Sequence, residues 1–401
     1  MKRGRKKGEN MAGQSNTERI IAIDVLRGFA LLGILLVNMP YFSSSVLYDR
    51  KGFNGLDHWT ATAIDIACEA SFYPLFAFLF GFSMIMFRDR LRQRQLPFIR
   101  IFARRFMFLL VVGLIHAFLI WFGDILISYA LVGGILLLFA HARPRAWLAG
   151  AIICFSVLHF SVVLLLGMTS GLEGTKGADH GNAALAVKAL HHYQNGTLSD
   201  IFWQRWNDWM YVNGSGGLLF TVATMLPLCL FGGYVAQKRW VEEADRYTGV
   251  IRQVALLSLI AGLFLKTLPY FTIDNEFTAY IQHIFGGTSL ACFYGTVILL
   301  LLQKNWWKQK LMIFQYIGKM SLTNYLLQSI VCTMLFYHYG LGWYGKMSMF
   351  AGTLLAIILY SVQLVISRQW LRHFQFGPME WIWRCVSYGK RWAIYKQKRP
   401  S

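Results

Sequence analysis

The sequence predicts an all-α, polytopic membrane protein with about ten transmembrane helices and with both termini in the cytoplasm. Of its 401 residues, 56% are hydrophobic and only 14% are charged, which is too apolar for a soluble domain. The apolar residues form long runs, and the basic residues gather in alternate connections between these runs. These features together predict a chain made mostly of membrane-spanning helices.

The apolar runs have the length that a helix needs to cross a hydrocarbon core of about 30 Å. We read the first as an uncleaved span, because it is too long for a signal peptide, contains Arg27 and has no small-x-small cleavage site. An amphipathic segment at Trp59 is an alternative start for the second. In order, the expected spans are Ile20–Phe42, Ile64–Phe87, Phe106–Trp121, Ile125–Ala140, Ala146–Met168, Gly216–Val235, Val250–Leu268, Tyr280–Leu302, Met320–Tyr339 and Ser348–Ile366.

The distribution of charge orients these spans. With a cytoplasmic N-terminus, the inner segments hold 31 of the 39 lysines and arginines, as the positive-inside rule requires. The net charge of +20 is therefore typical of membrane topology. Binding to nucleic acid would need a basic face on a soluble module, so no nucleic-acid partner is expected, whereas membrane lipids are.

Three regions follow from this topology. Residues 1–19 form a basic cytoplasmic tail, residues 20–366 the transmembrane domain, and residues 367–401 a basic, Trp-rich cytoplasmic tail suited to the inner membrane surface. The longest outer loop, 169–215, is expected to hold a short interfacial helix rich in Trp and His. Its length fits a lid or binding segment, and its aromatic content fits a belt on the membrane surface.

No motif indicates a metal or a bound cofactor. The six cysteines show no CxxC spacing and mostly fall within apolar runs, where they act as small core residues. The sequence contains no GxGxxG, Walker, HExxH or GxSxG pattern. Candidate chemistry must therefore come from polar groups within the spans.

The third span supplies the first candidates. Arg104 and Arg105 stand at its inner edge, His116 lies within it, and Asp124 follows in a turn. A neutral imidazole can act as a general base, and a carboxylate can orient it. A straight helix places Asp124 roughly 12 Å beyond His116, which argues against direct contact. The structural alternative for His116 is a hydrogen bond between helices.

The first span repeats the spacing of the third. Arg27 and Asn38 are eleven residues apart, like Arg105 and His116, and eleven steps of about 100° return to the same helix face. Asp24 lies one turn before Arg27 and can pair with it. Arg27 and Asn38 are candidates for lining a donor path, with membrane anchoring and interhelical bonding as their alternatives.

Further polar groups lie in other spans. Asp65 and Glu69 share one face at the start of the second span, and Glu69 is the deeper of the two carboxylates. Asn324 and Gln328 share a face of the ninth span, where they either line a substrate path or join helices. Lys266, near the outer end of the seventh span, is expected to extend toward the membrane surface.

Five segments resemble the YeiB family of bacterial inner-membrane proteins, over nearly the whole chain. They are ERIIAIDVLRGFALLGILLVN, FYPLFAFLFG, GLIHAFLIWFGDILISYALVG, GKMSLTNYLLQSIVCTMLFYHYGLG and WLRHFQFGPMEWIWR. The resemblance implies a multi-pass protein of the bacterial inner (plasma) membrane. That family is a domain of unknown function, for which transport has been suggested.

The first span is also similar to a wider superfamily of transmembrane acyltransferases. This similarity implies transfer of an acyl group from cytosolic acyl-CoA to a glycan or lipid acceptor on the far side. In the O-acyltransferase branch, an arginine is followed eleven residues later by a catalytic histidine. Here Arg27 fits the pattern, but the second position is Asn38, which cannot act as a general base.

Two functional hypotheses follow. In the first, the segment from Arg88 to Arg105 attracts the donor's phosphates, His116 is the general base, and Glu69 or Asp124 assists. In the second, the polar groups of several spans form a transport path for a small or amphipathic solute. The sequence does not indicate the oligomeric state.

Overall fold

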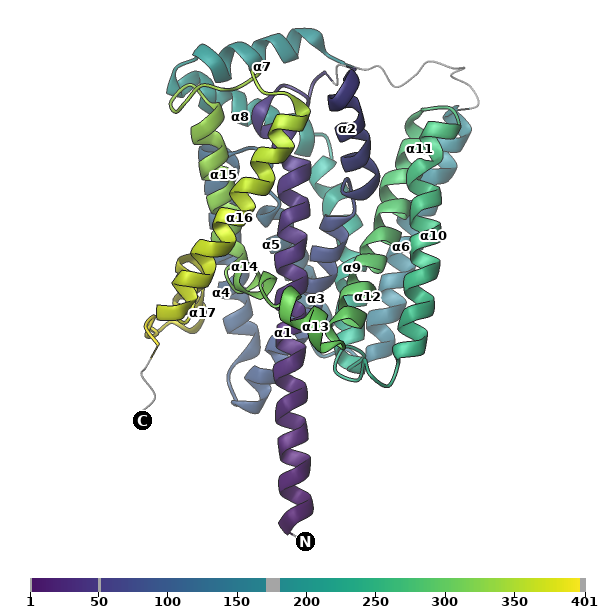
Figure 1. The fold of residues 1–401 in the computed structure, drawn as a ribbon, viewed down its shortest axis with the longest axis vertical. Helices are drawn as coiled ribbons and strands as arrows, with labels where there is room; N and C mark the ends of the chain where they lie inside the picture. The colour runs from purple at the N-terminus through teal and green to yellow at the C-terminus, as the bar shows by residue number, and fades with distance from the viewer. Residues whose placement is uncertain (1, 50–51, 171–180, 397–401) are drawn as a thin grey trace.

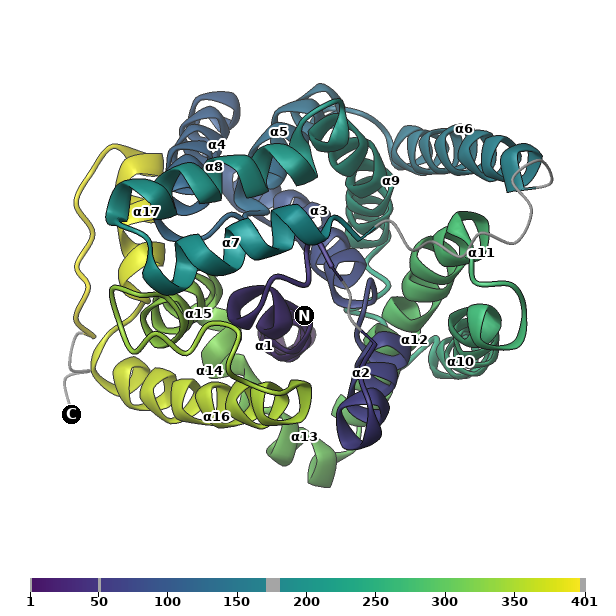
Figure 2. The same cartoon turned by 90° about the horizontal axis from the view of Figure 1, so that it is seen from above.

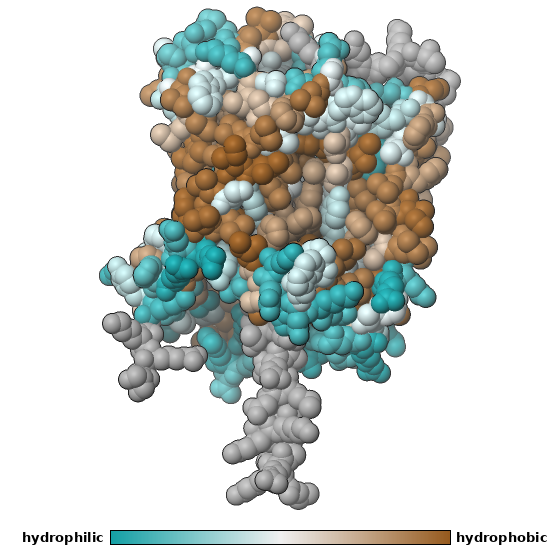
Figure 3. Space-filling view, viewed as in Figure 1, coloured by the Kyte–Doolittle hydropathy of each residue, from teal (hydrophilic) through white to brown (hydrophobic). Residues whose placement is uncertain are grey.

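The computed structural model describes residues 2–49, 52–170 and 181–396, and this part of the chain is a bundle of helices (Figure 1). On the face drawn in Figure 3, a broad apolar band crosses the middle of the bundle, with hydrophilic surface above and below it. The N-terminal end of α1 (Lys2–Ser43) and helix α17 (Pro378–Tyr388) lie at one end, which we call the basic end (Figure 1). Helices α7 (Ala183–Asn195) and α8 (Leu198–Asn213) cover the other, which we call the capped end.

Among the residues that the structure describes, seven helical segments are long and apolar enough to cross a membrane, which confirms a helical membrane protein. They belong to α1 (Lys2–Ser43), α2 (Gly55–Ala67) with α3 (Phe72–Gln93), α6 (Pro144–Ser170), α9 (Gly217–Lys238), α10 (Thr248–Phe271), α11 (Glu276–Tyr280) with π-helix η3 (Ile281–Gly286) and α12 (Gly287–Leu302), and α16 (Met349–His373). The tenth expected span thus continues to His373, past the expected domain boundary at residue 366.

The three remaining expected spans are also helical, but they are shorter or more polar. They are α4 (Phe98–Ile115) with π-helix η1 (His116–Ile120), α5 (Leu126–Leu136) with the 3₁₀-turn η2 (Leu137–Phe139), and α15 (Ser321–Phe336). The basic residues on α4 lower its average hydropathy. The count of ten spans therefore stays a prediction, although every expected apolar run is largely helical.

The second span is broken, contrary to the single helix expected from Ile64 to Phe87. Helix α2 ends at Ala67 and α3 begins at Phe72, with Ala70 between them in the left-handed region (φ 54°). An alanine in this conformation is strained. The break leaves backbone carbonyl groups free at a depth where they need partners inside the protein.

The described part of the longest connection, residues 169–215, forms two helices rather than the one expected. Helices α7 (Ala183–Asn195) and α8 (Leu198–Asn213) lie side by side across the capped end (Figure 2). Asp208 of α8 accepts hydrogen bonds from Tyr48 (2.6 Å) and Tyr193 (2.5 Å), and Arg205 donates to the Leu119 carbonyl (2.8 Å). These bonds tie the cap to the ends of α1 and η1, so the loop closes over the bundle.

Three short helices lie toward the basic end. Helices α13 (Asn305–Leu311) and α14 (Phe314–Lys319) connect α12 to α15, and α17 (Pro378–Tyr388) follows α16. Helix α17 packs against α4 and α15, so part of the C-terminal tail belongs to the bundle. Trp383 of α17 donates a hydrogen bond to the Arg105 carbonyl (3.0 Å).

Close helix contacts set the positions of the central elements. Helix α1 lies at the centre of the bundle in the view from above, while α6 and α10 lie at its side (Figure 2). Helix α3 packs along α9 with almost no space between the backbones. A Cβ at Gly81 would lie 1.8 Å from the Cys229 carbonyl oxygen, and one at Gly232 would lie 2.0 Å from that of Phe78.

This contact generates a stability prediction. Gly81→Ala and Gly232→Ala each force α3 and α9 apart, and we expect each to lower the free energy of unfolding by about 1–3 kcal/mol. The matched control is Gly134→Ala, because a Cβ at Gly134 meets no atom within 4 Å. It should be neutral or stabilising. Thermal unfolding of the purified proteins in detergent measures the difference, and equal melting temperatures for all three would contradict the proposed close contact.

Candidate functional site

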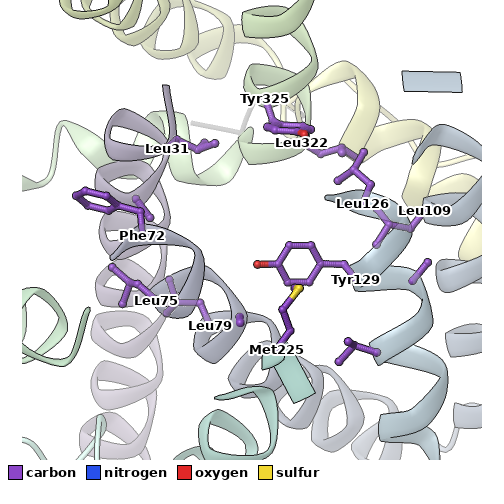
Figure 4. Close-up of a cluster of buried hydrophobic side chains, with 14 of the residues drawn as sticks. Leu31, Phe72, Leu75, Leu79, Leu109, Leu126, Tyr129, Met225, Leu322 and Tyr325 are labelled. Atoms are coloured by element: carbon purple, nitrogen blue, oxygen red, sulfur yellow. The ribbon is translucent and has the colours of Figure 1, made fainter. Parts of the chain in front are cut away.

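A cavity of about 580 Å³ lies inside the bundle. It extends from a group of charged side chains at the basic end to Asn38 and Glu69. Helices α1, α3, α4, α5, α15 and α17 all contribute lining residues. The middle of its wall is apolar and aromatic, with Leu31, Phe72, Phe76, Phe80, Leu109, Leu126, Tyr129 and Tyr325. Part of this wall is shown in Figure 4. A cavity of this size is within the range of small-molecule sites.

Cationic side chains gather where the cavity meets the basic end. The lining residues there include Arg27, Arg90, Arg105, Lys319 and Arg384. Two carboxylates, Asp24 and Glu380, also line this mouth, so cations outnumber anions. Such an excess of positive charge favours a ligand with anionic groups.

Arg27 and Arg105 are held in place by neighbouring groups. Arg27 pairs with Asp24 (3.4 Å), as the spacing predicted, and donates to the Ser83 hydroxyl. The Arg105 guanidinium lies over the rings of Phe87 (4.4 Å) and Trp383 (3.9 Å). These contacts fix both cations at the mouth and leave them able to bind a further anion.

Helix α17 closes one side of the mouth through Glu380. This carboxylate accepts hydrogen bonds from the backbone N–H groups of Leu322 (2.8 Å) and Thr323 (3.1 Å), and from the Thr323 hydroxyl (2.6 Å). It thus caps the start of α15, where the helix dipole favours a negative charge. Burial raises the pKa of Glu380, and the hydrogen bonds from Thr323 act in the opposite direction.

Asn38 and Glu69 line the cavity farther from this mouth. Asn38 and Arg27 share the cavity-facing side of α1, as their spacing predicted. Glu69 lies in the break between α2 and α3, and its backbone carbonyl accepts a hydrogen bond from Lys266 (3.1 Å). Neither the Asn38 amide nor the Glu69 carboxylate has a side-chain hydrogen bond to another described residue. Both are therefore available to a ligand.

Asp65 does not face the cavity but stabilises the broken segment. It forms an ion pair with Lys266 (3.8 Å) and accepts hydrogen bonds from Tyr270 (2.8 Å) and Gln282 (2.6 Å). The Lys266 side chain is fully buried, so the expectation that it extends to the membrane surface is wrong. The ion pair with Asp65 and the hydrogen bond to the Glu69 carbonyl reduce the cost of burying the lysine.

His116 contacts Asp124 directly, against the expectation from a straight helix. The chain winds into η1 at His116 and becomes extended at Trp121 (φ −158°, ψ 133°), which brings Asp124 back. His116 Nδ1 lies 2.9 Å from Asp124 Oδ1, and Nε2 lies 2.8 Å from the Ser329 hydroxyl. His116 and Ser329 are buried, and none of the three is among the cavity-lining residues. Both ring nitrogens of His116 therefore form hydrogen bonds within the protein, outside the cavity.

The other sequence-derived candidates also lie away from the cavity. Asn324 donates to Ser367 (3.0 Å) and Gln328 donates to Gln363 (3.0 Å), so both join α15 to α16. Arg104 is exposed, while its neighbour Arg105 lines the cavity. In the described part of the chain, no group of three or more His, Cys, Asp or Glu side chains is arranged to hold a metal.

Sequence reasoning missed four groups, three at the cavity and one away from it. At the cavity, Ser83 accepts a hydrogen bond from Arg27, Glu380 caps α15, and Tyr129 contributes to the wall. Away from the cavity, Ser329 completes the arrangement around His116. Glu380 had a usable signal, because a lone carboxylate in the Trp-rich GPMEWIWR segment is unusual. The other three are ordinary residues in apolar runs, and only their neighbours distinguish them.

Fold and cavity together define a class: a helical membrane protein with an internal cavity that is cationic at one end. A model of the family described as "Protein of unknown function (DUF418)" matches residues 235–390. The chain is 37% identical to "Uncharacterized protein YxaH" of Bacillus subtilis (strain 168) over 391 residues, which is 92% of this chain and 94% of the relative. It is 29% identical to "Uncharacterized protein YeiB" of Escherichia coli (strain K12) over 399 residues, or 92% and 96% of the two chains. The chain belongs to this DUF418 family, which confirms the resemblance found in the sequence.

The arrangement around His116 generates the second prediction. His116→Ala removes a fully buried ring and one of the two hydrogen bonds to the buried Asp124 carboxylate, which keeps only the bond from the Ile127 N–H (2.9 Å). Because it leaves a cavity and weakens the support of this carboxylate, we expect it to lower the free energy of unfolding by about 3–5 kcal/mol. Ser329→Ala removes one neutral hydrogen bond and should cost about 1 kcal/mol. Thermal unfolding in detergent compares the two. A His116→Ala protein as stable as the Ser329→Ala protein would mean that this group does not hold η1 in place.

Proposed function

We propose that this protein is a membrane-embedded acyltransferase that moves an acyl group from cytosolic acyl-CoA to a glycan or lipid acceptor on the far side of a bacterial inner membrane. The observation that carries the proposal is the cavity, which joins a cationic mouth to an apolar wall and then to Asn38 and Glu69. Acyl-CoA has the matching order of groups: anionic phosphates, a thioester and an apolar chain.

The topology that this requires has ten spans, with the basic end and both termini in the cytoplasm. The charge distribution of the connections supports it, because basic residues are retained on the cytoplasmic side. In this orientation the cationic mouth opens to the compartment that holds acyl-CoA. Helices α7 and α8 then cover the outer face.

The donor's phosphates contact the cations of the mouth, with Arg27 and Arg105 already fixed by their neighbours. The pantetheine arm and the acyl chain extend along the aromatic wall. The acceptor approaches from the other side, at the break between α2 and α3. This places donor and acceptor in one cavity without moving either one across the membrane.

In the transfer step, the acceptor's hydroxyl or amine gives its proton to the Glu69 carboxylate. Its oxygen or nitrogen forms a bond to the thioester carbonyl carbon, the C–S bond breaks, and the departing CoA thiolate takes up the proton. We assign Glu69 as the general base because its carboxylate lines the cavity. His116, with Asp124, is then a positioning residue that supports the wall beside Tyr325, whose ring centroid is 5.0 Å from its own.

The alternative function is transport of a small or amphipathic solute. The observation that favours it is the interrupted second span beside a π-helix, because broken helices form many substrate sites in transporters. Uptake into proteoliposomes without any acyl donor would support transport, and uptake that depends on the donor would exclude it.

Donor binding gives the third prediction. We expect Arg105→Gln to weaken binding of palmitoyl-CoA about tenfold, since it removes a charged hydrogen-bond donor from the mouth. Arg104→Gln is the matched control, because Arg104 carries the same charge but is exposed and outside the cavity. Isothermal titration of the purified proteins measures both affinities. Equal losses for the two variants would indicate a general effect of net charge and contradict a binding site at the mouth.

The general base gives the fourth prediction. Glu69→Gln should reduce transfer of a radiolabelled acyl group by about 10²–10⁴-fold while leaving palmitoyl-CoA affinity unchanged, because the amide cannot accept the proton. The assay uses membranes that contain the native acceptors. A fully active Glu69→Gln protein, beside a folded but inactive His116→Gln protein, would return the role of base to His116.

A further inference from the structure

Tyr129 lines the cavity, and its buried hydroxyl has no hydrogen-bond partner among the described residues. The residue is only 3% exposed. Its ring is held in place by Phe76 and Phe80, with centroids 6.1 Å and 4.9 Å away. Figure 4 shows the hydroxyl turned away from its own helix and toward the side of the cluster where Leu31 and Phe72 lie.

Tyr325, at the same cavity, does have a partner. The Tyr325 hydroxyl donates to the Gly123 carbonyl (3.1 Å), and the buried Tyr360 hydroxyl, outside the cavity, donates to the Gly28 carbonyl (2.7 Å). A buried hydroxyl without a partner costs about 1–3 kcal/mol. Phenylalanine at position 129 would fill the same space without this cost, so the hydroxyl points to a partner that binds from outside the chain.

The position of the hydroxyl limits what that partner can be. The surrounding wall is apolar, with Leu31, Phe72 and Leu126 among its members, and offers no counterion for a charged group. A charge there would be costly, whereas a neutral carbonyl oxygen accepts one hydrogen bond and tolerates apolar neighbours. The ligand's anionic groups have their own site at the cationic mouth. The partner is thus an uncharged acceptor partway along an amphipathic molecule.

We propose that Tyr129 donates a hydrogen bond to the carbonyl oxygen of the substrate's acyl group and is a catalytic residue of this protein. The inference rests on the proposed acyl transfer and specifies where in the cavity the reacting carbonyl lies. As the acceptor attacks, negative charge develops on that oxygen, and the hydrogen bond becomes stronger. Tyr129 then stabilises the tetrahedral intermediate, while Glu69 holds the proton taken from the acceptor.

The test compares two ligands that differ only in the carbonyl group. Palmitoyl-CoA has it, and the thioether S-hexadecyl-CoA does not. The wild-type protein should bind palmitoyl-CoA about five- to tenfold more tightly, and Tyr129→Phe should bind the two equally. A Tyr129→Phe protein that keeps the wild-type preference overturns the proposal. A wild-type protein without a preference also overturns it, because water alone would then satisfy the hydroxyl.

Stability separates this role from a structural one. Tyr129→Phe should leave the melting temperature of the ligand-free protein unchanged or raised, since no bond within the protein is lost. Tyr360→Phe is the matched control and should lower it while keeping the ligand preference. A lowered melting temperature for Tyr129→Phe would assign the hydroxyl to the fold and contradict the proposal.

A second ligand pair distinguishes two outcomes: that acyl-CoA is not the donor, and that Tyr129 does not bind the carbonyl group. Lysophosphatidic acid with an ester-linked chain and its alkyl-ether analogue again differ by one carbonyl group. If neither CoA compound binds but the wild-type protein prefers the ester and Tyr129→Phe does not, acyl-CoA is excluded as donor and the role of Tyr129 stands. If the wild-type protein prefers the carbonyl compound in neither pair, the inference is wrong.

Discussion

Polar groups within the apolar band must find their partners inside the protein, because the hydrocarbon core offers none. The bundle meets this constraint at several places by pairing helices. His116 joins Asp124 and Ser329, Lys266 joins Asp65, and α15 and α16 exchange amide hydrogen bonds. Glu69, Asn38 and Tyr129 line the cavity, and the Tyr129 hydroxyl is buried there without a hydrogen-bond partner among the described residues. These polar groups in the cavity wall are what make the cavity a candidate site.

The same constraint explains why the cavity differs from one end to the other. Charged groups at the basic end can remain near water, so Arg27 and Arg105 need only partial pairing. Farther from the basic end, the cavity wall is aromatic. The polar side chains there are isolated from one another and neutral, apart from Glu69. Helix α17 contributes to this division, because Glu380 holds it on α15 while Trp383 stacks on Arg105. A segment outside the expected transmembrane domain therefore forms one wall of the mouth.

Much of this fold could be predicted from the sequence, because apolar length and charge asymmetry act through simple physical rules. The pairing of Asp24 with Arg27 and the common face of Arg27 and Asn38 followed from helical spacing alone. The contact between His116 and Asp124 did not, since it depends on a π-helix that no local pattern announces. Lys266 was misjudged because its partner lies in another span, some 200 residues away. The role of Tyr129 could not be foreseen, because an unpaired hydroxyl is defined only by its neighbours.

The break between α2 and α3 shows how strain and the site depend on each other. Ala70 holds a left-handed conformation, and its carbonyl oxygen lies where a Cβ on Gly287 would come within 2.3 Å of it. Lys266 donates a hydrogen bond to the adjacent carbonyl of Glu69. The carbonyl groups of Glu69 and Ala70 are therefore both fixed by the helices beside them. Such strain costs of order 1–3 kcal/mol and persists only where the surroundings enforce it. The break places the Glu69 carboxylate in the wall of the cavity. An unbroken helix would have continued past the cavity at this point.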